Sequence, residues 1–473
     1  MRPLRLSPTG RGRLGRASIA LVLTLTAAGN ALGCADDEAG MPSAPIGDPA
    51  SLESVAGTVV VSTAAELVAA LSPDNAGQRI LLRAGTYALT TPLTVPDGAT
   101  LEGEGVMQFD EAGLPIGFGA GAQTTLTMSA NVPGNMLTLG NGTTLRRLKV
   151  ADLAGRGGNV VAVLSRKAGD RVSATIAETE IVNANPSGVG PDGPTGRGLL
   201  VLTRNPSLGA DPAPDEGAAV TARMGRSVIR SPAAGAGLFA INFAAFGRVS
   251  VTLDDNVIGG GIDADGGVSR PDAVHDATVL IESHRNLYRD DSPDACATPH
   301  LGWSLTGGSG PPAPLPVGET ARNSLSVHSV DDRIEGFGSG VVAAGARRYF
   351  PSPIAGPSTG NRLELELLRG TISTPSCAGA PFVRDVDLAG AFAAGDDFSP
   401  GDGNTAHISL RGVTGSGARF NRYAAALGPS GPLPAELERG NRLEFAGSAG
   451  AFAATNAHID PAPGAGHFTS AAP

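Results

Sequence analysis

The chain has 473 residues, including 67 glycines and 36 prolines, and a formal net charge of −10. Charged residues make up 17% of it, against roughly 25% in ordinary globular domains, which argues against a long helical bundle or a coiled coil. The acidic balance also excludes nucleic acid as an expected partner, because phosphate binding needs clustered lysine and arginine.

Residues 1–33 have the pattern of an export signal. Five arginines and no acidic residue precede the apolar stretch Ala17–Ala28, which is too short to span a membrane. We therefore expect residues 1–33 to be a signal peptide and the protein to be exported. Residues 34–57 are acidic and then rich in alanine, proline, glycine and serine, which predicts a flexible tether.

Cysteine placement adds to the predicted location. The segment Asn30–Cys34 resembles the lipobox of bacterial lipoproteins, although Ala31 stands where that pattern has leucine. Lipidation of Cys34 would place the protein in the bacterial cell envelope, with membrane contact through the anchor only. Ordinary cleavage and extracellular release is the alternative. In an oxidising compartment Cys296 and Cys377 are expected to form a disulfide, the alternative being two free thiols.

The folded region is predicted to begin near Val59, where three consecutive valines favour a strand. Thr63 and Glu66 have the spacing of a capping box, in which each side chain bonds a backbone amide of the other residue. A short amphipathic helix over residues 63–71 follows, and Pro73 ends it.

Beyond residue 103 the helical period gives way to recurring short strands. Each has apolar residues at alternate positions and a further apolar residue nine places after the first. Short strands without long helices between them predict a solenoid, with a β-propeller as the weaker alternative. The template fits Val172, Ala174, Ile176 and Ile181; Val220, Ala222, Met224 and Ile229; Val249, Val251, Leu253 and Ile258; and Leu363, Leu365, Leu367 and Ile372.

Asparagine is a second marker of the repeat. Asn323, Asn361, Asn404 and Asn441 each stand just before a predicted strand. We expect these side chains to stack as an amide ladder at one corner of the solenoid, where they would bond backbone groups.

The opening segments resemble a known family. The predicted helix 63–71 is followed by Ala84-Gly85-Thr86-Tyr87 and by a turn-rich stretch at 96–105. Together they resemble the start of right-handed parallel β-helix proteins of the pectin-lyase-like superfamily. The resemblance implies an all-β fold, a right-handed parallel β-helix over residues 58–460 with a short N-terminal capping helix. Residues 461–473 read as a disordered tail.

The resemblance leaves the activity open, because the superfamily holds lyases, hydrolases, esterases, epimerases and non-catalytic surface proteins. Gly85–Tyr87 begins like the pectin methylesterase signature but lacks its glutamate. The chain has no Gly-His-Gly segment of the polygalacturonase kind. Asp272–Asp276 matches the Asp-Pro-His-Asp of alginate epimerases only loosely.

Stacking of the coils suggests an acidic column with interleaved arginines and one histidine instead. Equivalent residues of successive coils lie about 4.8 Å apart. Close carboxylates raise one another's pKa or bind a divalent cation, so Ca²⁺ is the cofactor that Asp254, Asp255, Asp331 and Asp332 suggest. A solvated ridge that keeps the coil soluble is the alternative. The candidate catalytic residues are Asp254, Asp255, His284, Asp331, Asp332 and Arg333.

Residues 290–322 are predicted to be an insertion beside that ridge, where binding loops of solenoids usually lie. Trp303 is the only tryptophan and would stack on a sugar ring, unless it is a hydrophobic plug that pins the loop. The candidate substrate-binding residues are Trp303, Arg285, Arg289 and His300.

Two functions remain open from the sequence. The first is an exported, lipid-anchored protein that binds polysaccharide or a cell-surface partner without catalysis, which the weak catalytic motifs favour. The second is a polysaccharide lyase or glycoside hydrolase that acts on an acidic polysaccharide at the predicted ridge.

Overall fold

The computed structural model describes the chain from Gly57 to Gly447 with internal gaps. Outside that range it describes strands β1 (Ser54–Val55), β42 (Ala457–His458) and β43 (Phe468–Ala471). The predicted signal peptide, Cys34, Cys296 and Cys377 therefore lie outside the described residues. The gaps are residues 129–131, 133, 154–157, 186–187, 191–192, 204–215, 232–235, 269–272, 293–299, 311–317, 349–357, 376–383, 393–400, 416–418 and 427–439.

The N-terminal cap forms as the capping box predicts. Helix α1 (Ala64–Ala70) begins after Thr63, whose hydroxyl accepts a hydrogen bond from the Glu66 N–H at 3.2 Å. The Glu66 carboxylate accepts the Thr63 N–H at 3.1 Å in return. Leu67 and Ala70 are buried, and a short 3₁₀ turn, η1 (Pro73–Asn75), follows the helix. Of the helices among the described residues, none is long and apolar enough to cross a membrane.

Three long sheets make up the rest of the fold, which we name sheets A, B and C. Sheet A contains β1, β2 (Thr58–Val61), β3 (Arg79–Leu82), β6 (Thr100–Gly103), β11 (Thr143–Arg146), β14 (Arg171–Ala177), β19 (Ala219–Gly225), β22 (Arg248–Asp254), β26 (Thr278–His284), β31 (Ser324–Val330), β35 (Arg362–Leu368), β38 (Thr405–Arg411), β41 (Arg442–Gly447) and β43. Sheet B contains β4 (Gly85–Leu89), β9 (Thr124–Met128), β12 (Lys149–Asp152), β15 (Glu180–Asn183), β20 (Val228–Arg230), β23 (Val257–Gly259), β27 (Leu287–Arg289), β32 (Arg333–Glu335), β36 (Thr371–Ser373) and β39 (Thr414–Gly415).

Sheet C contains β5 (Leu93–Val95), β10 (Asn135–Leu139), β13 (Asn159–Leu164), β18 (Leu199–Thr203), β21 (Leu238–Asn242), β24 (Ile262–Asp265), β28 (Leu301–Thr306), β33 (Ser339–Arg348), β37 (Arg384–Phe392), β40 (Arg419–Ala426) and β42, and β29 (Ser309–Gly310) pairs with β33. Smaller sheets join β7 (Met107–Phe109) with β8 (Pro115–Phe118), β16 (Gly188–Gly190) with β17 (Gly193–Thr195), and β25 (Val274–His275) with β30 (Thr320–Ala321) and β34 (Ser358–Thr359).

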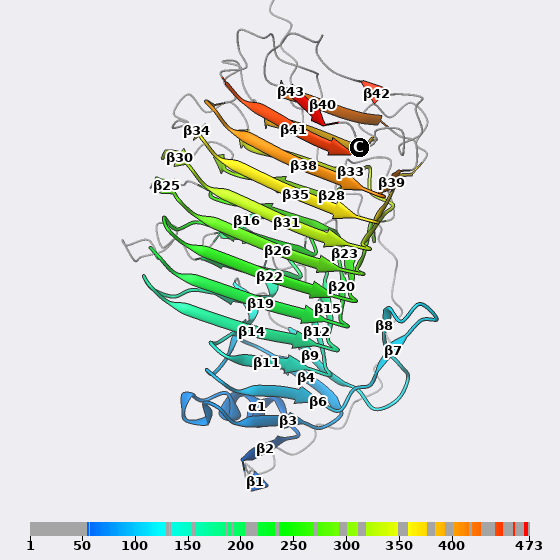
Figure 1. The fold of residues 1–473 in the computed structure, drawn as a ribbon. Helices are drawn as coiled ribbons and strands as arrows, with labels where there is room; N and C mark the ends of the chain where they lie inside the picture. The colour runs from blue at the N-terminus through cyan, green and yellow to red at the C-terminus, as the bar shows by residue number, and fades with distance from the viewer. Residues whose placement is uncertain are drawn as a thin grey trace, which may run out of the picture. The chain divides into compact units, whose positions relative to one another are not determined.

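Each coil passes through sheets A, B and C in turn, as β22, β23 and β24 do before β26 returns the chain to sheet A. Every strand of a coil pairs in parallel with its counterpart in the next coil, and Figure 1 shows the strands of sheet A stacked in chain order. The fold is a right-handed parallel β-helix, as predicted. Strand β43 lies in the segment predicted as a disordered tail and pairs with β41.

The apolar columns stack inside the coils as the template predicts. Val172 pairs in register with Val220, and Val220 with Val249. Ile181 and Ile229 do the same on sheet B, and all five side chains are buried. The period-2 pattern therefore fixes which face of each strand points inward.

The predicted amide ladder is also present. The Asn361 Oδ1 atom accepts both the backbone N–H and the side-chain amide of Asn323 at 3.1 Å. Asn404 accepts the same two groups of Asn361 at 2.9 and 3.0 Å, and Asn441 those of Asn404 at 2.9 Å. All four residues are fully buried, so each amide satisfies groups that water does not reach.

Replacement of Asn361 with alanine tests the ladder. It removes the acceptor of two buried Asn323 donors, and we expect a loss of about 1–3 kcal/mol in the free energy of unfolding. Urea denaturation followed by circular dichroism measures it. The exposed Gln123→Ala change is the control, with an expected effect within about 0.5 kcal/mol. An Asn361→Ala effect as small as the control would contradict a stabilising ladder.

Candidate functional site

The predicted acidic column lies at the corner between sheets A and B, where arginines interleave with its aspartates. The backbone is left-handed at this corner, with φ between 51° and 59°, a conformation that non-glycine residues adopt uncommonly. Each residue donates its N–H to a carbonyl of the next coil, so the residues form a column. We name this column the corner ridge: Arg226, Asp255, Arg285, Asp331 and Arg369.

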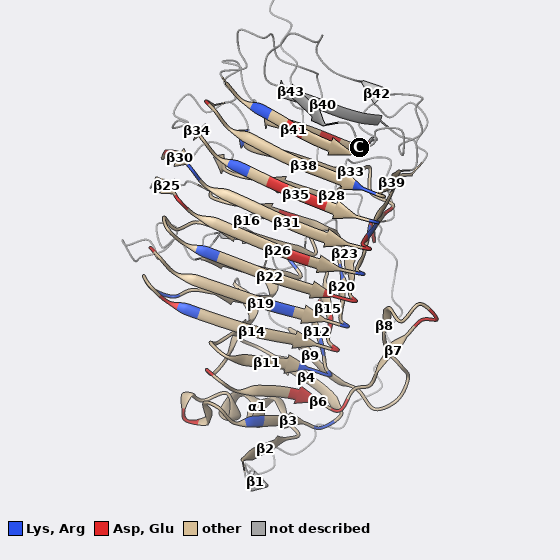
Figure 2. Ribbon diagram, in the orientation of Figure 1, with Lys and Arg blue, Asp and Glu red and all other residues tan. Residues whose placement is uncertain are grey.

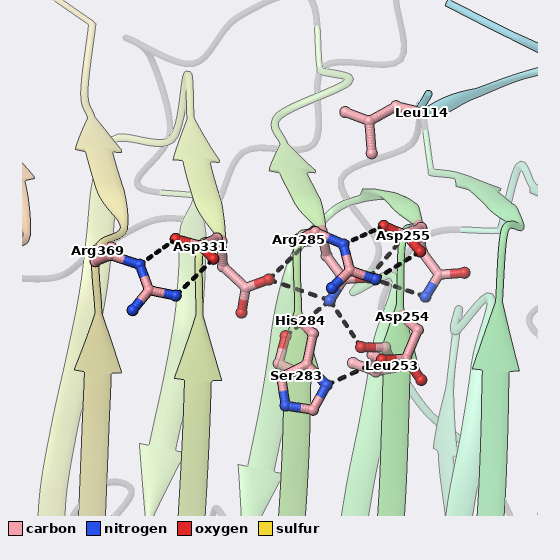
Figure 3. A network of polar contacts seen from close by, with 12 residues as sticks. Leu114, Leu253, Asp254, Asp255, Ser283, His284, Arg285, Asp331 and Arg369 are labelled. Carbon is pink, nitrogen blue, oxygen red and sulfur yellow. Dashed lines mark hydrogen bonds and ion pairs between the residues drawn. The ribbon is translucent and has the colours of Figure 1, made fainter. Parts of the chain in front are cut away.

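Ion pairs join neighbouring coils along the corner ridge (Figure 3), and Figure 2 shows residues of both charge signs near the carboxyl ends of the sheet A strands. Arg285 holds both oxygens of Asp255 at 2.7 and 2.8 Å, and Arg369 holds those of Asp331 at 2.9 and 2.8 Å. The hydrogen bonds from Arg369 lower the pKa of Asp331. A guanidinium therefore separates Asp255 from Asp331 along the column. Exposed pairs of this kind stabilise a fold only weakly.

Asp254 and His284 are brought together beside the ridge. They are register partners on β22 and β26, and the His284 Nδ1 atom lies 2.9 Å from Asp254 Oδ1. The His284 side chain is 35% exposed, and the Asp254 side chain is 47% exposed. The pair is therefore open to solvent, and the ion pairs of the ridge already satisfy the neighbouring charges.

Asp332 is a correction to the predicted site, because its side chain is buried and 2% exposed. Its Oδ1 accepts the Asn286 N–H at 2.7 Å and the Asn286 side-chain amide at 3.1 Å, and its Oδ2 accepts the Ser329 hydroxyl at 2.6 Å. Asp332 thus ends a second buried ladder, which we name the inner ladder: Thr179, Ser227, Asn256, Asn286 and Asp332. Burial raises the pKa of Asp332.

The four carboxylates suggested for Ca²⁺ are consequently not brought together. Asp332 belongs to the inner ladder, while Asp255 and Asp331 bind arginines on the ridge. In the part of the chain that the structure describes, no three His, Cys, Asp or Glu side chains are arranged to hold a metal ion.

Part of the predicted insertion is a core strand. Residues Leu301–Thr306 form β28 of sheet C, and the Trp303 ring is fully buried, edge-to-face with Tyr288 at 5.2 Å. Trp303 is therefore a core residue and does not face a ligand. His300 lies 2.9 Å from Asp290.

The two remaining predicted arginines lie on sheet B. Arg289 on β27 contacts Asp291 at 2.8 Å. Arg333 on β32 lies 3.8 Å from Glu335. Neither residue belongs to the corner ridge, so the structure separates them from Asp255 and Asp331.

The structure shows a carboxylate pair that the sequence analysis missed. Asp263 and Asp265 stand two residues apart on β24, so both point to the outer face of sheet C. Asp265 is 4% exposed, whereas Asp263 is only partly buried. Within the described part of the chain, the Oδ1 atom of each is buried without a hydrogen-bond partner. Hydroxyl groups also contact the pair: Ser304 for Asp263, and Ser309 and Thr306 for Asp265.

The surroundings of the pair are polar on one side and apolar on the other. In register, Asp263 lies between Phe239 and Ser304, and Asp265 between Ile241 and Thr306. Arg347 donates to the Ser304 hydroxyl at 2.9 Å. Arg197 lies over the Phe239 ring at 4.7 Å.

Burial raises the pKa of both carboxyl groups, and their charged neighbours act differently on the two pKa values. Arg197 and Arg347 favour the charged form of Asp263. For Asp265, burial and then the negative charge of Asp263 raise the pKa to about 7, against which Arg347 acts. Burial thus favours the protonated form of both carboxyl groups, and the nearby arginines act against it.

Comparisons with known proteins add only a distant likeness. No protein-family model and no curated protein matches the chain. Among solved structures, the A-module of mannuronan C-5 epimerase from Azotobacter vinelandii is similar, with a TM-score of 0.40 and 15% sequence identity, over 87% of this chain and 100% of that chain. A similarity of this size carries no argument about activity.

The neighbours Asp331 and Asp332 predict opposite pH responses. A raised pKa gives Asp332 a stabilising contribution that is present below the unfolded-state pKa of about 4 and is lost as pH rises through the folded-state pKa. A lowered pKa makes the contribution of Asp331 present above about pH 4 and lost at lower pH. For each variant we compare the change in melting temperature from the parent at the two pH values. The change caused by Asp332→Asn should be more favourable at pH 8 than at pH 4, and the change caused by Asp331→Asn should be less favourable at pH 8 than at pH 4.

Differential scanning calorimetry of the two variants and the parent at both pH values measures these shifts. Asp331→Asn is the matched control, because it changes the adjacent residue in the same way on the solvent side. A larger loss from Asp332→Asn at pH 8 than at pH 4 would mean that the hydrogen bonds to its carboxylate outweigh burial.

Proposed function

We propose that this protein is an enzyme that acts on polysaccharide, a glycoside hydrolase with Asp263 and Asp265 as its acid–base pair. The observation that carries the proposal is a pair of neighbouring carboxylates on one face of β24, each with a buried oxygen that no described residue satisfies. Hydrolysis of a glycosidic bond needs two such carboxyl groups in different protonation states.

The environment assigns the two roles. Asp265, with a pKa of about 7, is the general acid and donates its proton to the oxygen of the leaving sugar. Asp263, whose charge Arg197 and Arg347 favour, is the carboxylate that stabilises the developing positive charge at the sugar or activates the attacking water.

The two arginines also bear on the substrate. Their positive charges beside the pair favour a polysaccharide that carries carboxylate groups, since a guanidinium binds a carboxylate through two parallel hydrogen bonds. We therefore retain an acidic polysaccharide as the proposed substrate. A protein that binds without catalysis, which the sequence motifs favoured, would have no need for a carboxyl group that keeps its proton at neutral pH.

Replacement of Asp265 with asparagine tests the enzyme proposal. The loss of the general acid is expected to lower kcat by about 10²- to 10⁴-fold. Release of reducing ends from polygalacturonate, alginate and a neutral xylan is the assay, together with ultraviolet absorbance, which detects the unsaturated products of a lyase. Asp254→Asn on the sheet A side is the matched control and should leave kcat near that of the parent.

The pH profile provides a second readout of the same prediction. A general acid works only while protonated, so kcat should fall as pH rises through about 7. Absence of products from every polysaccharide, or a loss of activity in Asp254→Asn but not in Asp265→Asn, would contradict the assignment.

We also propose that the protein is exported and anchored through a lipid on Cys34. The support is the arginine-rich leader, its short apolar stretch and the lipobox-like segment Asn30–Cys34. A polysaccharide substrate outside the cytoplasm is consistent with such a location.

Replacement of Cys34 with alanine tests the anchor. The variant cannot carry the lipid and should move from the membrane fraction to the soluble fraction on cell fractionation, because no other segment of the sequence has the length of a membrane span. Ser43→Ala in the predicted tether is the control. An unchanged membrane fraction for Cys34→Ala would contradict lipidation.

A further inference from the structure

A second column of left-handed residues lies at the corner between sheets C and A, and one member is unusual. We name this column the second ridge: Gly217, Phe246, Asp276, Arg322 and Gly360, with φ between 52° and 67°. Their N–H groups bond carbonyls of the next coil. Glycine suits this conformation best, and Gly217 and Gly360 flank the three other members.

Phe246 is the one member of the second ridge with an aromatic side chain. Its φ is 56°, and a bulky aromatic residue with positive φ is an outlier. Its side chain is 55% exposed, so packing in the core does not offset the strain. Residues held in such conformations are concentrated at binding and catalytic sites, where the surroundings maintain them for a purpose other than stability.

Hydrogen-bonding groups surround the exposed ring. The His275 ring is perpendicular to that of Phe246, with ring centres 4.8 Å apart, and so covers at most one face of it. The His275 Nδ1 atom lies 3.0 Å from Asp276 Oδ2, and Arg322 holds both oxygens of Asp276 at 3.0 and 2.7 Å. About a third of each of the His275 and Asp276 side chains is exposed, and 62% of Arg322.

We propose that Phe246 is a stacking platform for a sugar ring of the polysaccharide, at a subsite separate from the Asp263–Asp265 pair. A pyranose ring has an apolar face of C–H groups and a rim of hydroxyls. The electron-rich face of an aromatic ring attracts the C–H groups, while Asp276, His275 and Arg322 offer acceptors and donors to the hydroxyls. The naming of a polysaccharide as the ligand rests on the proposed function.

The place of the second ridge suits this role. Phe246 follows the carboxyl end of β21, and Asp265 is the last residue of β24, the next strand of sheet C. The platform therefore stands at the edge of the face that carries the acid–base pair. A single aromatic ring among charged side chains is too small for a protein interface, which buries about 800 Å² on each partner.

Binding by an inactive variant tests the platform without turnover. In the Asp265→Asn background, we expect Phe246→Gly to weaken binding of polygalacturonate or alginate at least about tenfold in isothermal titration calorimetry. Its melting temperature should be unchanged or higher, because glycine accepts the left-handed backbone without strain. Phe246→Tyr should retain binding, and Phe246→Leu, which is apolar but has no aromatic face, should lose it.

Leu153→Ala is the control, because this side chain is apolar and 62% exposed but lies away from the second ridge. Binding by Phe246→Gly equal to that of the Asp265→Asn parent overturns the platform, as does a parent that binds none of the polysaccharides. Hydrolysis that survives Asp265→Asn, combined with a loss of binding in Phe246→Gly, overturns the acid–base assignment and leaves the platform standing.

Discussion

Parallel stacking of coils in register is the constraint on which the rest of this structure depends. Each residue lies directly above its counterpart in the next coil, at the spacing of neighbouring strands in a sheet. A side chain must therefore pack well against an identical side chain, or against one of complementary charge or hydrogen-bonding character, at the equivalent position of the next coil. Apolar residues such as Val172, Val220 and Val249 repeat inside, and buried amides repeat at the corners. Charges cannot repeat without repulsion, so they alternate along the corner ridge.

The sequence predicts those features that depend on period alone. Alternation of apolar residues identifies the inward faces, and an asparagine before each strand identifies a ladder, because both signals recur at the length of a coil. The capping box at Thr63 and Glu66 is a local signal and was equally readable. The fold, its N-terminal cap and its core columns were accordingly foreseen.

The candidate site was harder to predict, because a shift of one position along the chain changes whether a side chain points into the core or to solvent. Asp331 and Asp332 are adjacent, yet the left-handed backbone at Asp331 turns the first to solvent and the second into the inner ladder. Counting offsets from the strand start does not reveal that turn. Arg369, the partner of Asp331, lies a full coil later in the chain, and nothing local connects the two.

The Asp263–Asp265 pair was missed for a different reason, and a buried Trp303 was only one of two interpretations. Both lie in alternating segments, Leu301–Leu305 and Ile262–Asp265, where the period-2 rule places tryptophan inside and the aspartates outside. The alternation was in the sequence, but a lone tryptophan in a segment rich in proline and glycine suggested a binding loop. The burial of the two aspartates depends on what covers sheet C, which no periodicity encodes.

The two ladders have a direction, and this bears on how such a protein can change length in evolution. In each ladder the donors point toward the C-terminal coils, from Asn256 to Asn286 to Asp332 and from Asn323 to Asn441. A duplicated coil inserted between two asparagines would meet a donor from the coil on its N-terminal side and an acceptor on the coil on its C-terminal side. An ionised carboxylate has acceptors only, so the Asp332 side chain supplies no donor to a coil beyond it. A coil duplicated beyond Asp332 would receive only a backbone N–H from this residue, whereas one duplicated after an asparagine would also receive a side-chain amide.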